Sequence, residues 1–129
     1  MSVNIAIDGP AGAGKSTIAK AVAKELEFIY VDTGAMYRAM ALHLLRQNIA
    51  PGEEDKMDAA CENAEISIVY EDGAQQVLLN GENVTASLRK EEVGNMASVS
   101  SARPRIREKL VELQRVLAAK ADVVMDGRD

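Results

Sequence analysis

One segment, Gly9-Pro10-Ala11-Gly12-Ala13-Gly14-Lys15-Ser16, constrains the fold of this chain more than any other. A short apolar run, Val3 to Asp8, precedes it and is typical of a buried strand. Residues Lys15 to Leu26 follow, with an apolar stripe at helical spacing formed by Ile18, Ala19, Val22, Ala23 and Leu26. We therefore predict a strand, a glycine-rich turn and a helix in direct succession.

The turn fits the pattern G-x-x-x-x-G-K-S/T, which requires a strand before it and a helix after it. Glycines let backbone N–H groups turn toward phosphate oxygens, and the positive end of the following helix points at the same place. Lys15 can then reach the β- and γ-phosphates of a nucleotide, and the Ser16 hydroxyl can ligate Mg²⁺. An ordinary glycine-rich loop that binds nothing is the alternative, but such a match arises by chance in only roughly one of a few hundred chains of this length.

Strand and helix patterns alternate along the first part of the chain and then change. A second apolar strand covers Phe28 to Val31, and helical patterns cover Met36 to Gln47 and Glu53 to Ala64. This alternation predicts an α/β fold with a parallel sheet. Alternating residues and the Asn80-Gly81 turn signal indicate a small antiparallel meander at Ile66 to Val84. Two more helices and a third core strand complete the prediction, at Leu88 to Val99, Pro104 to Ala121 and Val123 to Met125.

Polar residues follow the second and third predicted core strands, and a parallel sheet binds ligands beyond its carboxyl ends. After the second strand, Asp32 and Thr33 begin a segment that should face the same crevice as the glycine-rich turn, and Arg38 can hold a second phosphoryl group there as a bidentate donor. After the third strand, Asp126 can orient a magnesium shell or an acceptor, and Arg128 can neutralise phosphate. The alternatives are a plain cap for the first two residues, a solvated helix position for Arg38 and a surface turn after the third strand.

Composition narrows the class of protein. The 129 residues, 47% of them hydrophobic, suit one ordinary domain, and the formal net charge of −5 argues against a nucleic-acid partner. No apolar run approaches the roughly 20 residues of a membrane helix, and no signal-peptide core follows Met1, so we expect a cytoplasmic protein without a membrane partner. Cys61, the single cysteine, is expected to be a buried thiol, and His43, the only histidine, to lie at the core edge or the surface without a catalytic role.

The motif series of the whole chain resembles that of the bacterial cytidylate kinases. It consists of the glycine-rich turn and four further segments in matching order and spacing, namely Asp32 to Arg38, Asn95 to Ser98, Pro104 to Arg107 and Asp126 to Asp129. The resemblance is to the amino-terminal part of that family, and it implies a P-loop kinase-type parallel sheet flanked by helices, with a small antiparallel β insert. It also implies three regions: the first part of the P-loop core at 1–52, a monophosphate-binding region at 53–105 with the insert at about 66–84, and a return helix and core strand at 106–129.

Residue roles follow from the resemblance position by position. The ATP phosphates would be held by Gly9, Pro10, Ala11, Gly12, Ala13, Gly14, Lys15, Ser16 and Thr17. CMP would be bound by Thr33, Tyr37, Arg38, Ser98, Arg107, Arg128 and Asp129, of which Ser98, Arg107 and Asp129 would read the cytosine edge. Catalysis would depend most on Lys15, Arg38 and Arg128. Mg²⁺ would be held by Ser16 and, through a water molecule, by Asp126.

The activity that the resemblance implies is transfer of the γ-phosphoryl group of Mg·ATP to CMP or dCMP by a monomeric enzyme of pyrimidine nucleotide metabolism. Two other hypotheses stay open on the motifs alone: another small-molecule P-loop kinase, and a non-catalytic nucleotide-binding fragment. The family continues beyond this motif series with further strands and a mobile lid. We therefore expect a kinase core in which the strand before the glycine-rich turn has an open edge.

Overall fold

The computed structural model describes residues 3–7, 15–71 and 74–126, with the backbone alone at positions 7, 15, 16 and 126. Three parallel strands form the core sheet in the order β1-β6-β2. They are β1 (Asn4–Ile7), β6 (Val123–Asp126) and β2 (Ile29–Tyr30). Ile7 is in register with Asp126, and Tyr30 is in register with Val124. The predicted parallel sheet is confirmed, and β1 lies at one edge of its described part.

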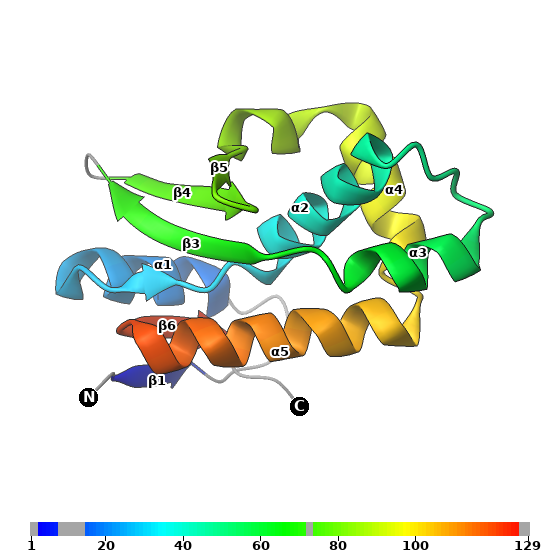
Figure 1. Cartoon of the computed structure of the whole chain (residues 1–129). Coiled ribbons are helices and arrows are strands. Elements are labelled where there is room, and N and C mark those ends of the chain that lie inside the picture. Colours follow the sequence, from blue (N-terminus) through cyan, green and yellow to red (C-terminus); the bar gives the residue numbers. More distant parts are fainter. Residues whose placement is uncertain (1–2, 8–14, 72–73, 127–129) are drawn as a thin grey trace.

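Helices cover both faces of this sheet (Figure 1). α1 (Lys15–Leu26) packs on one face, where Ala19 lies in the same apolar cluster as Val124. α5 (Pro104–Lys120) lies on the other face, and its buried residues share a cluster with Val123. Successive strand residues point to opposite faces, so these two neighbouring valines each serve one helix layer. Both are fully buried, which explains the purely apolar start of β6.

α2 (Thr33–Arg46) is the central helix of the main core. It packs against α3 (Glu54–Cys61) and α4 (Glu91–Ser100), and also against the β insert. Its fully buried residues are Met36, Ala39, Met40, Ala41 and Leu44. Small residues alternate with long ones along this helix, so neighbouring elements approach its backbone closely while the methionines fill the gaps between them.

The insert is an antiparallel meander in the order β3-β4-β5, as predicted. Its strands are β3 (Ile66–Glu71), β4 (Ala74–Leu79) and β5 (Glu82–Asn83). Asn80 and Gly81, between β4 and β5, have φ angles of 50° and 84°. Two successive positive φ angles suit a two-residue hairpin turn, for which Asn-Gly is the preferred sequence. The buried face of the meander, which joins the main core, consists of Ile66, Ile68, Val77 and Leu79.

The chain after the insert departs from the predicted single helix at Leu88 to Val99. Residues Thr85–Arg89 form a 3₁₀ helix, η1, and α4 begins only at Glu91. Lys90 between them has an extended backbone, with φ −66° and ψ 141°, so the two helices are not continuous. Acidic residues at the first two positions of α4 favour a helix N-terminus at this point.

Part of the apolar stripe predicted for α1 is not buried. Ile18 and Leu26 are 51% and 45% exposed, whereas Ala19 and Ala23 are buried. The described sheet is only three strands wide, so it offers packing partners to the middle of the stripe alone. Within the described residues, β1 pairs with β6 alone.

A glutamine side chain attaches the insert to the core sheet. The N–H and C=O groups of Tyr30 point away from β6, because residues of a parallel strand bond to alternate sides and Ile29 and Val31 donate toward β6. The Gln75 amide bonds to both of these backbone groups. Its Nε2 donates to the Tyr30 carbonyl at 2.9 Å, and its Oε1 accepts from the Tyr30 N–H. One side chain of β4 therefore pairs with β2 as a neighbouring strand would.

We expect Gln75→Ala to lower the free energy of unfolding by about 1–2 kcal/mol, because it removes both hydrogen bonds to the Tyr30 backbone. Gln76→Ala is the matched control. Gln76 accepts only an exposed hydrogen bond from Asn83, so its loss should cost less than about 0.5 kcal/mol. Urea denaturation of the two variants measures the difference, and equal losses would contradict a special role for Gln75.

Candidate functional site

The carboxyl edge of the core sheet brings two predicted segments together. β1 ends at Ile7 and α1 begins at Lys15, so the glycine-rich turn has the strand before it and the helix after it that its pattern requires. Asp126 ends the adjacent strand in register with Ile7. The two neighbouring strands therefore end at the same edge of the sheet. Gly9 to Gly14, Arg128 and Asp129 lie outside the described residues.

The second core strand leads directly into α2. The Asp32 carboxylate accepts a hydrogen bond from the Ala35 N–H at 3.0 Å, so this residue is the N-cap of the helix. The cap explains why α2 begins at Thr33 and not at Met36 as the apolar pattern predicted. Tyr37 and Arg38 follow one turn later. Although they are neighbours in sequence, they line two different hollows.

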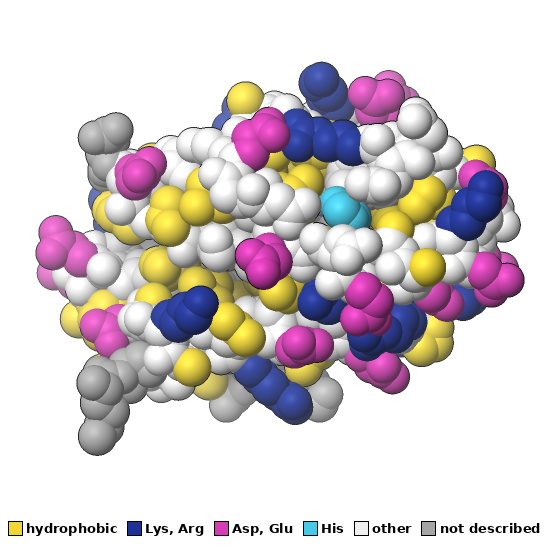
Figure 2. All heavy atoms as spheres, viewed as in Figure 1, with side chains coloured by type: hydrophobic (Ala, Val, Ile, Leu, Met, Phe, Trp, Pro, Cys, Tyr) yellow, Lys and Arg dark blue, Asp and Glu magenta, His cyan; other side chains and the backbone are white. Residues whose placement is uncertain are grey.

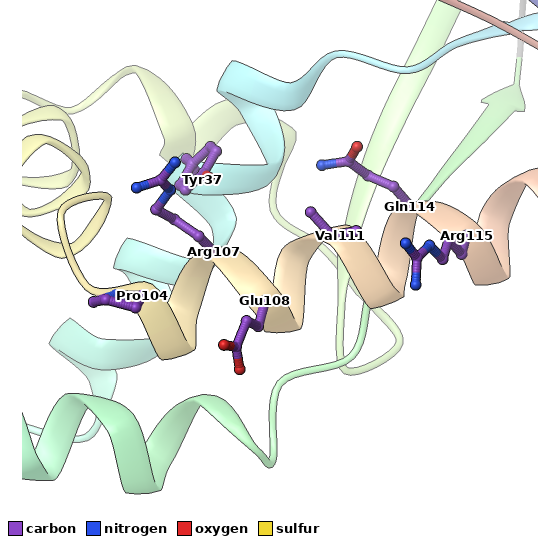
Figure 3. A pocket seen from close by; sticks show the side chains of 7 residues that line it. All are labelled: Tyr37, Pro104, Arg107, Glu108, Val111, Gln114 and Arg115. Carbon is purple, nitrogen blue, oxygen red and sulfur yellow. The ribbon is translucent and has the colours of Figure 1, made fainter. Parts of the chain in front are cut away.

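The larger hollow, which we call the Arg107 hollow, has a volume of about 630 Å³. Its lining consists of Tyr37 from α2 and Pro104, Arg107, Glu108, Val111, Gln114 and Arg115 from α5. Arg107, Val111 and Gln114 are spaced four and three residues apart, so they form one stripe of α5. Figure 3 shows Arg107 and Gln114 pointing to the side where Tyr37 lies, whereas Glu108 points away from it.

The smaller hollow, which we call the Arg38 hollow, has a volume of about 300 Å³. Its lining consists of Asp32, Gly34, Ala35, Arg38, Thr85, Leu88 and Arg89. Arg38 is exposed, but its Nη1 donates a hydrogen bond of 2.9 Å to the Leu88 carbonyl. The first turn of α2 therefore faces η1 across this hollow, with an arginine contributed from each side.

Three other predicted residues line neither hollow. Thr17 is exposed in the first turn of α1, and Thr33 is half-buried at the start of α2. Ser98 is exposed on α4, where its hydroxyl donates to the Gly94 carbonyl at 3.3 Å. The structure describes these three positions, and none of them belongs to the lining of either hollow.

The arginines around Pro104 have different partners. Arg103 forms ion pairs of 2.6 Å with both Asp58 and Glu54 of α3, and Arg105 pairs with Glu62 and with Glu108. Figure 2 shows basic and acidic side chains next to one another where α3 and α5 meet. By contrast, no described carboxylate pairs with Arg107. Arg103 and Arg105 therefore join helices, while Arg107 presents its charge to a hollow.

The ion pair changes the titration of Asp58. The hydrogen bond from Arg103 and its positive charge hold the pKa of the Asp58 carboxyl below its usual range. The same contact raises the pKa of Arg103. Both side chains are about three-quarters buried, at 29% and 25% exposure, so solvent screens this pair less than a fully exposed one.

Cys61 is buried, as expected from the sequence, and His43 lies within the core and not at the surface. Cys61 is fully buried, and burial raises the pKa of its thiol. His43 is also buried, and its Nε2 lies 2.9 Å from the Ala60 carbonyl, a contact that joins α2 to α3. Across residues 3–7, 15–71 and 74–126, no cluster of three or more His, Cys, Asp or Glu side chains could hold a metal ion. Over the same ranges, no helix is long and apolar enough to cross a membrane.

The sequence model of the cytidylate kinase family matches residues 5–129. The chain belongs to this family. A cytidylate kinase of Desulfitobacterium hafniense is 52% identical over 128 residues, which are 99% of this chain and 55% of that protein. The cytidylate kinases of Caldicellulosiruptor saccharolyticus and Listeria innocua are 51% and 52% identical, over 98% and 97% of this chain and 56% and 55% of their own lengths. The chain thus spans about 55% of the curated cytidylate kinases that it matches.

Several residues that line the two hollows were not predicted from the sequence. Val111 and Gln114 follow Arg107 at helical spacing, on a stripe of α5 distinct from the buried Ile106, Leu110, Leu113 and Leu117. That spacing was a usable signal for the Arg107 hollow. Arg89 carried no comparable signal, because its position depends on the break between η1 and α4, which the apolar pattern did not predict.

We expect Arg103→Ala to lower the free energy of unfolding at neutral pH by more than a substitution of Arg107, because Asp58 loses its charged partner. The folded-state pKa of Asp58 is lowered, so this stabilisation is present above the ordinary aspartate pKa of about 3.9 and is lost as the pH falls below it. The difference between the unmodified chain and the variant should therefore shrink in acid. Denaturant titrations at several pH values measure it.

Arg107→Ala is the control for that series. It removes the same kind of side chain from the first turn of α5, close to the N-cap residue Arg103, without breaking a described ion pair. The stability of this variant should therefore stay within about 0.5 kcal/mol of the unmodified chain at each pH. A loss as large as that of Arg103→Ala would show that Arg107 is also structural.

Proposed function

We propose that this chain is the part of a cytidylate kinase that binds both nucleotides, and that it transfers the γ-phosphoryl group of Mg·ATP to CMP or dCMP. Membership of the family supports the reaction class. The observation that carries the acceptor assignment is the Arg107 hollow. Its volume of about 630 Å³ suits a ligand of nucleoside size, and Arg107, one of the two arginines in its lining, has no described carboxylate partner to compete with that ligand.

The donor side of the proposal rests on the glycine-rich turn. ATP phosphates would be held by residues 9–17, with Lys15 neutralising charge on the β- and γ-phosphates. Mg²⁺ would be held by the Ser16 hydroxyl and, through a water, by Asp126. Hydroxyl and carboxylate oxygens are ligands that Mg²⁺ prefers. The register of β1 with β6 supports this pairing, because the strand that leads into the glycine-rich turn ends at Ile7, opposite Asp126.

The acceptor side would divide between the two hollows. Tyr37 and Arg107 would contact the nucleoside, and Ser98 and Asp129 would complete the reading of cytosine. The amino group of cytosine suits a carboxylate acceptor, and its O2 and N3 atoms suit arginine and hydroxyl donors. Arg38, Arg128 and Thr33 would hold the phosphate of the acceptor. A site that relies on the amino group should reject uracil strongly, because the carboxylate would then be left without a donor.

Chemistry at such a site consists mainly of positioning and charge neutralisation. In-line phosphoryl transfer leaves little covalent work for the protein, so Lys15, Arg38, Arg128 and the metal ion would dominate, without a covalent enzyme intermediate. Mg²⁺, when bound with ATP, supplies charge neutralisation on the phosphates. We further propose that the protein is a cytoplasmic monomer of pyrimidine nucleotide metabolism.

The test is phosphoryl transfer from Mg·ATP to CMP, dCMP, UMP and AMP by the 129-residue chain, with nucleotide binding measured in parallel. We expect transfer to CMP or dCMP above UMP and AMP. Lys15→Ala is the control and should lower the rate about 100-fold or more with the fold retained. Equal transfer to all acceptors would favour another small-molecule kinase. Binding of both nucleotides without any transfer would favour a non-catalytic nucleotide-binding unit.

Substitution of Arg107 tests the acceptor assignment separately. We expect Arg107→Ala to raise the KM for CMP about tenfold and to reduce the preference for CMP over UMP, because a charged hydrogen-bond donor to the base is lost. The KM for ATP should not change. Lys120→Ala removes a positive charge at the other end of α5 and serves as the control. A parallel rise in the KM for ATP would contradict the assignment.

A further inference from the structure

The segment that follows the β insert contributes to the Arg38 hollow in two ways. The Leu88 carbonyl of η1 accepts the hydrogen bond from Arg38, and the next residue, Arg89, supplies a second guanidinium-bearing side chain to the lining. The hollow is therefore bordered by arginines from elements that are about 50 residues apart in sequence.

Arg38 is held from two sides. Its Nη1 donates to Leu88 at 2.9 Å, and its guanidinium also lies against α4, where a Cβ added at Gly94 would be 3.8–3.9 Å from three of its atoms. These are ordinary van der Waals distances, so the guanidinium lies close to the backbone of α4. The hydrogen bond and this contact restrict the Arg38 side chain, and such restriction reduces the entropy lost on binding.

The charges around this hollow favour an anion. Arg89 is exposed, and no described carboxylate forms an ion pair with it or with Arg38. The one acidic residue in the lining, Asp32, is already engaged in capping α2 through the Ala35 N–H. The N-terminal turn of this 14-residue helix borders the hollow as well, and its partial positive charge adds to that of the arginines.

The β insert fixes the start of η1. The Thr85 hydroxyl accepts from the Val77 N–H of β4 at 2.8 Å and donates to the Asn83 side chain of β5 at 2.7 Å. The Thr85 N–H donates to the same Asn83 oxygen at 3.1 Å. Three hydrogen bonds therefore tie the segment that carries Arg89 to two strands of the insert.

From this geometry we propose that Arg89 binds the phosphate of the monophosphate acceptor together with Arg38, and that the β insert serves to position it. The ligand is a phosphate monoester dianion, whose three terminal oxygens can accept hydrogen bonds from two guanidinium groups. The proposal rests on the proposed function and extends it. It makes the insert part of the acceptor site and assigns a role to a residue outside the motif series.

Calorimetric binding of CMP and of cytidine to the 129-residue chain tests this proposal, because the two ligands differ only by the phosphate. We expect Arg89→Ala to raise the Kd for CMP about tenfold and to leave the Kd for cytidine unchanged. Arg89→Lys keeps the charge without the bidentate fork and should give an intermediate loss. Lys90→Ala removes a positive charge from the adjacent residue, which does not line the hollow, and should leave both constants unchanged.

The outcomes separate this proposal from the proposed function. CMP binding that survives in Arg89→Ala at the original affinity would overturn the role of Arg89 alone. An equal loss for CMP and cytidine would also overturn it, because a merely structural role would affect both ligands. If the unmodified chain bound neither CMP nor cytidine, the acceptor function and the role of Arg89 would fail together.

Discussion

The described structure depends on the burial of α2. Met36, Met40 and Leu44 are fully buried between α3, α4 and the β insert, and each large side chain contributes about 1.5–3 kcal/mol relative to exposure. The same helix starts shortly after the carboxyl end of β2, where Asp32 caps its N-terminus, and it carries Tyr37 and Arg38. Core packing therefore also fixes two candidate ligand-binding side chains relative to the sheet, so the fold and the site cannot vary independently.

Local patterns predicted most of this fold because they report local physics. The strand before the glycine-rich turn, the Asn80-Gly81 hairpin and the apolar stripe of α5 all appear where their periodicity or turn residues indicated. Prediction failed where tertiary partners decide the outcome. The break at Lys90 depends on how η1 packs against the insert. The exposure of Ile18 depends on the width of the sheet on which α1 packs. Neither property is encoded in the spacing of apolar residues.

The candidate site was predictable only in part, for a related reason. Arg103, Arg105 and Arg107 look alike in sequence, and only family resemblance selected the third. The structure supplies the physical distinction, because the first two are neutralised by Asp58 of α3 and by Glu62 directly after α3, more than 40 residues earlier in the chain. Arg89 shows the opposite case. Its charge was visible in the sequence, but its neighbour across the hollow, Arg38, lies on an element that only the fold brings near.

The attachment of Gln75 to β2 has a consequence beyond holding the insert. An outer strand with unpaired N–H and C=O groups is a template on which another chain can add a strand, and proteins protect such strands from aggregation in several ways. Here the amide of one side chain occupies the hydrogen-bonding groups of Tyr30, and the insert from which it comes covers that flank of the sheet. The insert therefore also protects β2 from intermolecular strand addition.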